Sequence, residues 1–251
     1  MRIIYNNRVT AVSTTEENAN FPEENLLDEH PRKVWRATSK DATITASLTN
    51  GTDVALFNTN AMTATVTLKV GATTVYSQYY DMSGILDYYQ WLNDLGEAQY
   101  SIWFNYSGYA QGGAHTVEFA LDTLSATTIL EAGVVFGGLA YQTGRGIQYG
   151  AKEGLVDYSI KKELSNGSRY YRKRDVVRSF SCSMILNRST RDFYTFMGRI
   201  AQAAGPKPLA WKLTDVNDVD WTVYAYFSQL PDATHDYPND SLVSFSLTEE
   251  V

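Results

Sequence analysis

The strongest constraint on this fold is a strict alternation of side-chain types between positions 63 and 70. Four apolar residues there alternate with three threonines and one lysine. A period of two predicts an antiparallel strand with one face in the core and the other in water. Similar runs between turn residues bring the expected total to about eight strands, which favours a β-sandwich or jelly roll over a parallel α/β sheet. These runs occupy residues 42–48, 54–57, 75–80, 101–106, 115–121 and 128–136.

The composition agrees with a β-rich globular protein. Of its 251 residues, 44% are hydrophobic, 20% are charged and 13% are aromatic. Aromatic and β-branched residues favour strands. Two segments of the first half depart from the strand pattern. Residues 5–20 are polar and predict irregular structure, whereas residues 85–95 follow a helical step and predict a short helix.

An early tryptophan is expected in the core. The sequence Asn25-Leu26-Leu27-Asp28 leads through a polar turn to Val34-Trp35-Arg36. Six residues separate Asp28 from Trp35, too few for another helix or strand. The segment therefore predicts a tight irregular crossing that places Trp35 in the core.

The second half predicts a separate, smaller β-sandwich with one packed helix. Glycines cluster between residues 137 and 150, so we place a domain boundary there, giving domains 1–140 and 141–251. A long hairpin is expected from strands 155–163 and 169–186 around an Asn-Gly turn. A helix of about 189–204 follows, with Ser189 as N-cap and Asp192 as a capping-box variant. Its buried face is expected to comprise Phe193, Phe196, Met197, Ile200, Ala201 and Ala204, which follow a helical spacing. Gly205 and Pro206 end it, and three strands at 209–213, 221–227 and 242–247 complete the chain.

Charge is unevenly distributed along the chain. Residues 1–150 contain 8 Lys and Arg against 15 Asp and Glu, a net charge of −7 that equals the charge of the whole chain. Residues 161–199 contain 10 basic and 3 acidic residues, and residues 215–250 contain 8 acidic and no basic ones. Such segregation can steer one surface towards its complement on a neighbouring subunit. It is equally compatible with two solvated edges.

Catalytic, metal and cofactor signatures are absent from the sequence, which predicts that the protein is not an enzyme. The three histidines are not spaced as metal ligands, and the lone Cys182 is expected to be a small core residue. The acidic run Asp215–Asp220 lacks the glycine of an EF-hand loop, so we interpret it as a turn and leave ion binding open. No apolar run is long enough to span a bilayer, and the polar N-terminal residues predict no signal peptide.

The sharpest charged feature is the run Arg169-Tyr170-Tyr171-Arg172-Lys173-Arg174. Arginines interleaved with aromatic residues can stack on nucleobases. The same residue types are enriched in protein interfaces. A protein–protein contact is the favoured interpretation in this acidic protein, with a solvated strand and nucleic-acid binding as the alternatives.

Both parts of the chain resemble components of bacteriophage tails. The first part is similar to the discoidin-type (F5/8 C-like) β-sandwich of phage tail proteins. The second part resembles the tail-tube-like fold of phage distal-tail and baseplate proteins. The first resemblance rests on Asn25–Asp28, Val34–Arg36, Asp53–Asn60, the strand at 64–68 and the close at Ile129–Gly138. The second rests on Tyr149-Gly150, Asp157–Ser159, Gly167, Tyr170, Tyr171, Arg174, Arg178, Phe180 and the helix from Arg191.

The resemblance implies a structural virion component. Such proteins form a hexameric ring that continues the tail tube, contacts tail-tube, hub or fibre proteins, and lets DNA pass through its channel. It implies assembly in the host cytoplasm, a final location at the tail tip and no cofactor. The candidate subunit interface comprises Arg169, Tyr170, Tyr171, Arg172, Arg174, Asp215, Asp218 and Asp220.

Two other functions stay open at this stage. One is a carbohydrate-binding module that recognises host surface glycans. Its candidate contacts are Tyr79, Tyr80, Tyr88, Tyr89 and Trp91, for which packing or ring contacts are the favoured interpretation. The other is a glycan-cleaving enzyme, for which the sequence singles out no pair of carboxylates.

Overall fold

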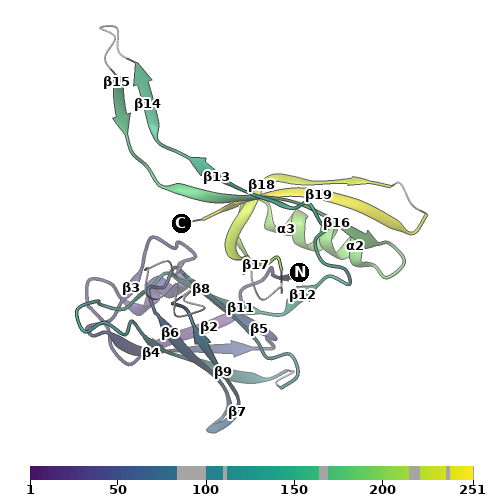
Figure 1. Cartoon of the computed structure of the whole chain (residues 1–251). Coiled ribbons are helices and arrows are strands. Elements are labelled where there is room, and N and C mark those ends of the chain that lie inside the picture. Colours follow the sequence, from purple (N-terminus) through teal and green to yellow (C-terminus); the bar gives the residue numbers. More distant parts are fainter. Residues whose placement is uncertain (84–99, 110–111, 164–168, 215–220, 236–237, 251) are drawn as a thin grey trace, which may run out of the picture. The chain divides into compact units, whose positions relative to one another are not determined.

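The alternating runs form strands, and the chain is mainly β, with 56% of residues in strands and 8% in helices. We describe a computed structural model of the whole chain (Figure 1), which describes residues 1–83, 100–109, 112–163, 169–214, 221–235 and 238–250. The helix expected at 85–95 lies outside these residues. The antiparallel sheets confirm the predicted mainly β, sandwich-type fold class.

Two compact units make up the chain. Unit 1 contains Met1, Thr143–Pro208 and Tyr224–Val251, and unit 2 contains Arg2–Gln142 and Leu209–Val223. The stretch Leu209–Val223 therefore belongs with the first half of the sequence, although it lies within the range assigned above to the second domain. Each unit is described below by itself.

Unit 2 is built on a five-stranded antiparallel sheet. The run with the clearest alternation forms its strand β6, with the predicted bounds Thr63–Val70. The even-numbered Ala64, Val66 and Leu68 are buried and face the core. The order of strands is β2-β4-β9-β6-β7. Their bounds are β2 Val9–Thr14, β4 Asp41–Thr49, β9 Ala114–Asp122, β6 Thr63–Val70 and β7 Thr73–Asp81.

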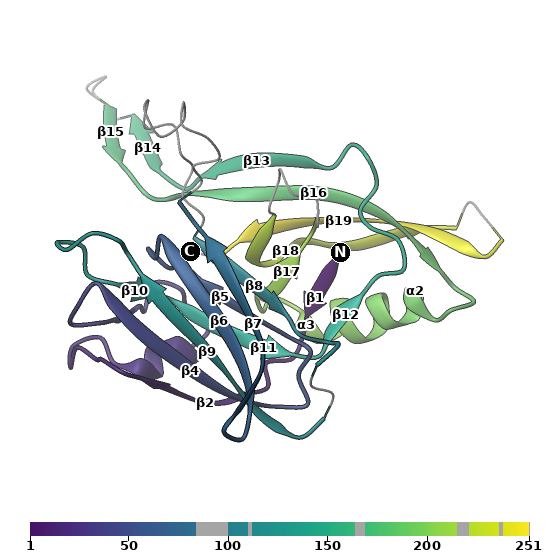
Figure 2. The ribbon, with the colours of Figure 1, turned by 60° about the horizontal axis from the view of Figure 1, so that its bottom comes forward.

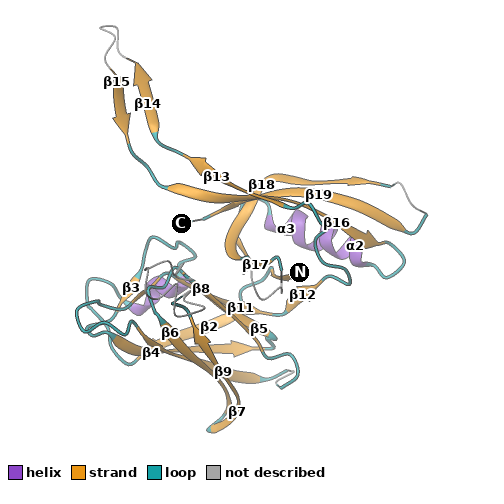
Figure 3. Ribbon diagram, in the orientation of Figure 1, coloured by secondary structure: helices purple, strands orange, loops and turns teal. Residues whose placement is uncertain are grey.

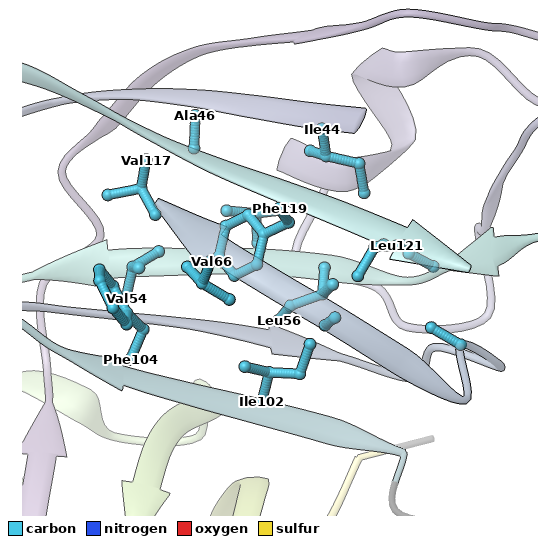
Figure 4. Packing of buried hydrophobic residues seen from close by; sticks show 14 of the residues in the cluster. Ile44, Ala46, Val54, Leu56, Val66, Ile102, Phe104, Val117, Phe119 and Leu121 are labelled. Carbon is cyan, nitrogen blue, oxygen red and sulfur yellow. The ribbon is translucent and has the colours of Figure 1, made fainter. Parts of the chain in front are cut away.

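A three-stranded sheet packs against the five-stranded one. Its order is β11-β5-β8, with bounds Val134–Gly138, Asp53–Phe57 and Ser101–Asn105. All five residues of β5 are buried, as expected for a short, uninterrupted apolar strand. Figure 4 shows the resulting core. Val66 and Phe119 of one sheet lie in the same buried cluster as Leu56 and Phe104 of the other.

Trp35 is fully buried in this core, which confirms the prediction for the early crossing. The preceding segment forms the short 3₁₀ helix η1 (Glu23–Leu27), which buries Leu26. The Asn25 side-chain amide donates to the carbonyl of Val34 at 2.9 Å and so holds the turn closed. Strand β3 (Trp35–Arg36) then pairs with β10 (Glu131–Ala132).

Two sequence predictions in unit 2 were wrong. Residues 9–14 form strand β2 rather than irregular structure, because they pair with β4 at the edge of the sheet. The strand expected over 128–136 is split into β10 and β11, because the chain changes partner from β3 to β5 at Gly133. A β-carbon at Gly133 would lie 2.8 Å from the carbonyl oxygen of Pro31, so only glycine fits there.

Three further strands of unit 2 involve the N-terminus. Strand β1 (Arg2–Ile4) pairs on one side with β12 (Ala140–Gln142) and on the other with β17 (Leu209–Lys212). Ile3 and Ile4 are fully buried. The first residues of the chain are therefore part of the packed structure.

Unit 1 contains a twisted sheet covered on one face by a helix. The strands lie in the order β18-β19-β16-β13 (Figure 2), with bounds Thr222–Thr234, Asp240–Glu249, Val176–Asn187 and Lys152–Asp157. The helix of 13 residues comprises α2 (Asp192–Tyr194), the π-helical η2 (Thr195–Ala201) and α3 (Gln202–Ala204), and lies against the sheet in Figure 3.

The helix face was predicted correctly, but its N-cap was not. Phe196 and Ile200 are fully buried, and the Phe196 ring lies 5.7 Å from that of Phe245. Arg191, in the left-handed conformation, is the N-cap, with no side-chain capping bond. Ser189 lies two residues before this N-cap, and its hydroxyl and backbone N–H both donate to Oδ1 of Asn187 instead.

Candidate functional site

The predicted long hairpin forms a two-stranded arm that extends beyond the sheet of unit 1 (Figure 1). The arm comprises strands β14 (Ile160–Glu163) and β15 (Arg169–Arg172) and the junction residues 158–159 and 173–175. The ladder runs from Ile160 opposite Arg172 to Glu163 opposite Arg169. The Asn-Gly turn itself lies outside the described residues. The expected continuous strands 155–163 and 169–186 are thus each interrupted once.

A serine bridges the interruption. The backbone N–H of Arg174 donates to the Ser159 hydroxyl oxygen at 3.0 Å, and that hydroxyl donates to the Arg174 carbonyl at 3.4 Å. The N–H of Ser159 donates to the carboxylate of Asp157 at 2.8 Å. The Ser159 side chain therefore takes the place of a backbone partner, and it joins the two strands where their regular ladder stops.

A tyrosine pair ties the base of the arm to the sheet. The hydroxyl groups of Tyr158 and Tyr226, the latter on β18, lie 3.4 Å apart. The hydrogen bond to Tyr158, together with burial, raises the pKa of Tyr226 to about 12. The Tyr226 phenol is therefore neutral at physiological pH, and its hydroxyl can form a hydrogen bond with the hydroxyl of Tyr158.

Large apolar side chains are exposed along the arm and its base. Opposite residues of an antiparallel pair point to the same side, so Tyr170 shares one face with Ile160, and Tyr171 lies on the other. Tyr170 is 51% exposed and Tyr171 is 61% exposed. At the base, Leu155 is 74% exposed and Val176 is 49% exposed. Each face therefore presents one tyrosine to solvent.

The cations of the arm are also exposed. Arg169, Arg172, Lys173 and Arg174 form no ion pair among the described residues. Arg178, which lies in β16 of the sheet, differs from them because its guanidinium binds the carboxylate of Glu249 at 2.7 Å. The structure thus brings together the predicted basic and aromatic residues of the interface. Its predicted acidic half, Asp215, Asp218 and Asp220, lies outside the described residues.

The candidate glycan contacts in unit 2 separate into different environments. Tyr79 is 63% exposed on the outer face of β7. Tyr80 faces the sandwich interior, where its hydroxyl donates to the carbonyl of Trp103 at 2.9 Å. Tyr88, Tyr89 and Trp91 lie outside the described residues.

Other titratable groups have structural surroundings. Cys182 is buried, as expected, and burial raises the pKa of its thiol to about 12. His115 is buried and accepts or donates hydrogen bonds at both ring nitrogens, to the Tyr106 hydroxyl at 2.8 Å and the Gly113 carbonyl at 3.2 Å. Burial lowers the pKa of His115.

Sequence reasoning missed two features that shape these sites. The Ser159–Arg174 junction has no local signature beyond a serine near the end of a strand. The hydrogen-bond network of Asp53 also has no local signature in the sequence; its carboxylate binds Arg2, Trp103 and Asn105.

In the described part of the chain, no group of three or more His, Cys, Asp or Glu residues is arranged to hold a metal ion. A search of the same residues finds no helix that is long and apolar enough to cross a membrane.

Comparisons with known proteins give weak likenesses. No protein-family model matches the chain, and no curated protein matches it in sequence. Among solved structures, it is similar to a chain in the crystal structure of reduced XRCC1 bound to the DNA polymerase β catalytic domain, with 14% identity and a TM-score of 0.40. That match covers 53% of this chain and 97% of the other. It is also similar to a chain in the virion of a native gene transfer agent particle, with 10% identity, a TM-score of 0.30, and coverage of 44% of this chain and 96% of the other.

Proposed function

We propose that this protein is a structural component of a bacteriophage tail tip or baseplate, of the distal tail type. In this proposal copies of the chain form a hexameric ring that continues the tail tube and anchors other tail proteins. The role is mechanical and requires no catalytic residue. The ring assembles in the host cytoplasm and ends at the tail tip of the virion.

The observation that carries the proposal is the exposed arm. An isolated two-stranded hairpin is at best marginally stable in water and needs a third strand or a packing surface. Tyr170 and Tyr171 extend to solvent from opposite faces of this hairpin, so neither face of the arm is packed. A neighbouring copy supplies the missing surface if the arm docks on it.

The chemistry of the arm suits a protein interface. Tyrosine and arginine dominate the binding energy of many interfaces, where single truncations cost about 2 kcal/mol or more. Contact between an arm and a different patch on the next copy is head-to-tail, and it closes into a ring when the rotation permits. The eight acidic and no basic residues of positions 215–250 offer the charge complement within the same sequence.

Charge reversal on the arm tests this proposal. We expect the purified wild-type protein to form rings, detected by light scattering and negative-stain imaging. In the double variant Arg172→Glu/Arg174→Glu, two attractive contacts become repulsive, and rings should be lost. The monomer should melt at the wild-type temperature, because both side chains are exposed and unpaired in the described structure.

A matched control separates arm chemistry from net charge. The variant Arg199→Glu/Lys207→Glu makes the same change of charge at two exposed positions of unit 1 outside the arm. It should assemble normally. Normal rings from the arm variant would contradict the role of the arm. A wild-type protein that stays monomeric at all concentrations, even with a cross-linker, would contradict the ring.

A further inference from the structure

The helix-covered face of the unit 1 sheet continues past the helix as an exposed strip. Phe180 of β16 and Leu247 of β19 lie opposite each other and are buried on the face where Phe245 packs against the helix. Side chains alternate between the two faces of a strand, so Arg178 shares the face of Phe180 and lies opposite Leu155 of the edge strand β13. We refer to the part of this face beyond the buried core as the uncovered strip. By alternation and register, it comprises Glu153, Leu155, Asp157, Val176, Arg178 and Glu249.

The centre of the uncovered strip is apolar. Leu155 is 74% exposed and Val176 is 49% exposed. Leu155 lies opposite Arg178, and Val176 lies two residues further along the same strand, so the two apolar side chains are diagonal neighbours. Single exposed apolar residues are ordinary on a protein surface. Here two of them adjoin on a face that is continuous with a packed core.

The charged groups of the uncovered strip are mainly acidic. Its three carboxylates outnumber its one guanidinium, which gives it a net charge of −2. The guanidinium of Arg178 lies 2.7 Å from the carboxylate of Glu249 and 4.0 Å from that of Glu153. The strip therefore suits a partner surface that combines apolar side chains with an excess of cations.

One face of the arm has this complementary chemistry. Ile160 lies opposite Arg172, and Lys162 lies opposite Tyr170, so these four residues share a face, which we call the Tyr170 face. Ile160 is 39% exposed and Tyr170 is 51% exposed. The two other residues give the Tyr170 face a net charge of +2 without any carboxylate.

The opposite face of the arm is a poorer match. It carries Tyr171, but it also carries the carboxylate of Glu163 directly opposite Arg169. That carboxylate would approach the acidic groups of the uncovered strip. The dimensions also agree, because strands rise about 3.4 Å per residue, which gives about 10 Å for the four-residue arm ladder and about 14 Å for the strip from Glu153 to Asp157.

We infer that the uncovered strip binds the Tyr170 face of the arm of a second copy of this chain. Tyr170 and Ile160 of one copy cover Leu155 and Val176 of the next, and the cations of the arm meet the surplus carboxylates of the strip. A chain cannot fill its own strip, because its arm starts at the end of the strip and leads away from the sheet (Figure 1). The contact is therefore head-to-tail, with one arm and one strip per copy. The inference rests on the proposed function and names the surface on which the arm docks.

Cysteine cross-linking of the full-length protein tests this contact directly. The variants Leu155→Cys and Tyr170→Cys are purified separately, mixed before assembly and oxidised. We expect a disulfide-linked pair of copies that contains one of each variant, identified on non-reducing gels and by mass spectrometry. The matched control replaces Tyr170→Cys with Tyr171→Cys, which lies on the other face of the arm and should give at least ten-fold less of the mixed pair.

A charge substitution in the strip tests its role in assembly. Leu155→Arg removes the apolar contact and adds a cation opposite the cationic arm, so the concentration needed for rings should rise at least ten-fold. The melting temperature should stay unchanged, because the Leu155 side chain is exposed. The control Tyr149→Arg adds the same charge at a fully exposed position of unit 1 outside the arm and the strip, and it should assemble normally.

Two outcomes would overturn the inference while leaving the ring intact. They are rings of Leu155→Arg at the wild-type concentration, and mixed pairs that form as readily with Tyr171→Cys as with Tyr170→Cys. A wild-type protein that forms no ring would contradict the proposed function. The cross-link between the Leu155→Cys and Tyr170→Cys variants would still decide whether arm and strip meet: the mixed pair supports the contact, and its absence refutes it.

Discussion

Replacement of Asp53 tests whether a single buried carboxylate holds the N-terminal strand to the sandwich of unit 2. Asp53 begins β5, and its side chain is completely buried. Its Oδ1 accepts hydrogen bonds from Arg2 at 3.1 Å, the Trp103 indole at 2.9 Å and the Asn105 amide at 2.8 Å. A carboxylate is stable in such a place only when its charge is paired and its lone pairs are occupied.

The cost of Asp53→Ala follows from what it leaves behind. The Arg2 side chain is 18% exposed, so its charge would lose its partner where water reaches it only in part. Breaking a buried ion pair from one side costs about 3–5 kcal/mol. The Trp103 indole, in a side chain that is 4% exposed, would lose its acceptor as well. We therefore expect a loss of about 4 kcal/mol in the free energy of unfolding, and about 2 kcal/mol for Asp53→Asn, which keeps one acceptor oxygen.

Urea unfolding followed by tryptophan fluorescence measures the difference, since Trp35 and Trp103 both lie in unit 2. The matched control is Asp28→Ala. Asp28 binds Lys33 in an ion pair whose side chains are 37% and 58% exposed, so its loss should cost less than about 1 kcal/mol. If Asp53→Ala stays within 1 kcal/mol of the wild type, or costs no more than Asp28→Ala, the reasoning about Asp53 is refuted.

Three further perturbations follow from buried groups. Burial lowers the pKa of His115 below its usual 6.5, so the folded state binds fewer protons than the unfolded state, and the free energy of unfolding should fall as the pH drops from 6.5 towards the folded pKa. Urea titrations at pH 7.5 and 5.5 should show a smaller fall in His115→Gln than in the wild type. Equal falls in the two proteins would contradict this. Because the Cys182 pKa is about 12, iodoacetamide at pH 8 should modify the thiol only on unfolding, as mass spectrometry would show, and rapid native labelling would contradict its burial. A β-carbon at Gly138 would collide with the carbonyl oxygen of Asn6, so Gly138→Ala should cost about 2 kcal/mol in the same urea assay, and wild-type stability would contradict that packing.

Local pattern was sufficient for β6, which has one face exposed to solvent, and for β5, which is buried on both faces. The alternation at 63–70 gave the bounds of β6, and the apolar run 54–57 lies within the fully buried β5. The helical spacing from Phe196 to Ala204 identified the buried face of the helix. In each case the burial that decides the structure is encoded within about ten neighbouring residues.

The features that sequence reasoning missed depend on distant partners. Strand β2 packs only the half-buried Val9 and Val12 against the core, and it forms because its backbone pairs with the edge of β4. Asp53 and Arg2 are separated by 51 positions. No local period contains such pairings. The helix start is different, because the group that binds Ser189 is local: Asn187, two residues earlier, accepts hydrogen bonds from the Ser189 hydroxyl and backbone N–H.

The same distinction applies to the candidate site. Its residue types were visible in the run 169–174, because interleaved tyrosine and arginine are enriched in protein interfaces. The shape of the arm could not be predicted, because the Ser159–Arg174 junction joins positions 15 residues apart and the Tyr158–Tyr226 contact joins positions 68 residues apart. The predicted acidic partner, Asp215, Asp218 and Asp220, lies outside the described residues.

The junction would lower the cost of the proposed assembly through the arm. A free hairpin samples many conformations, and docking would have to order it at a cost in entropy. Here the Ser159 hydroxyl closes the gap in the ladder, and the Tyr158 hydroxyl fixes the base to Tyr226 on β18. Both contacts are made within one chain, so part of the ordering occurs before any partner arrives. The tyrosines and arginines beyond the junction are thereby presented in a limited set of orientations, and in the proposed ring more of their contact energy would contribute to affinity.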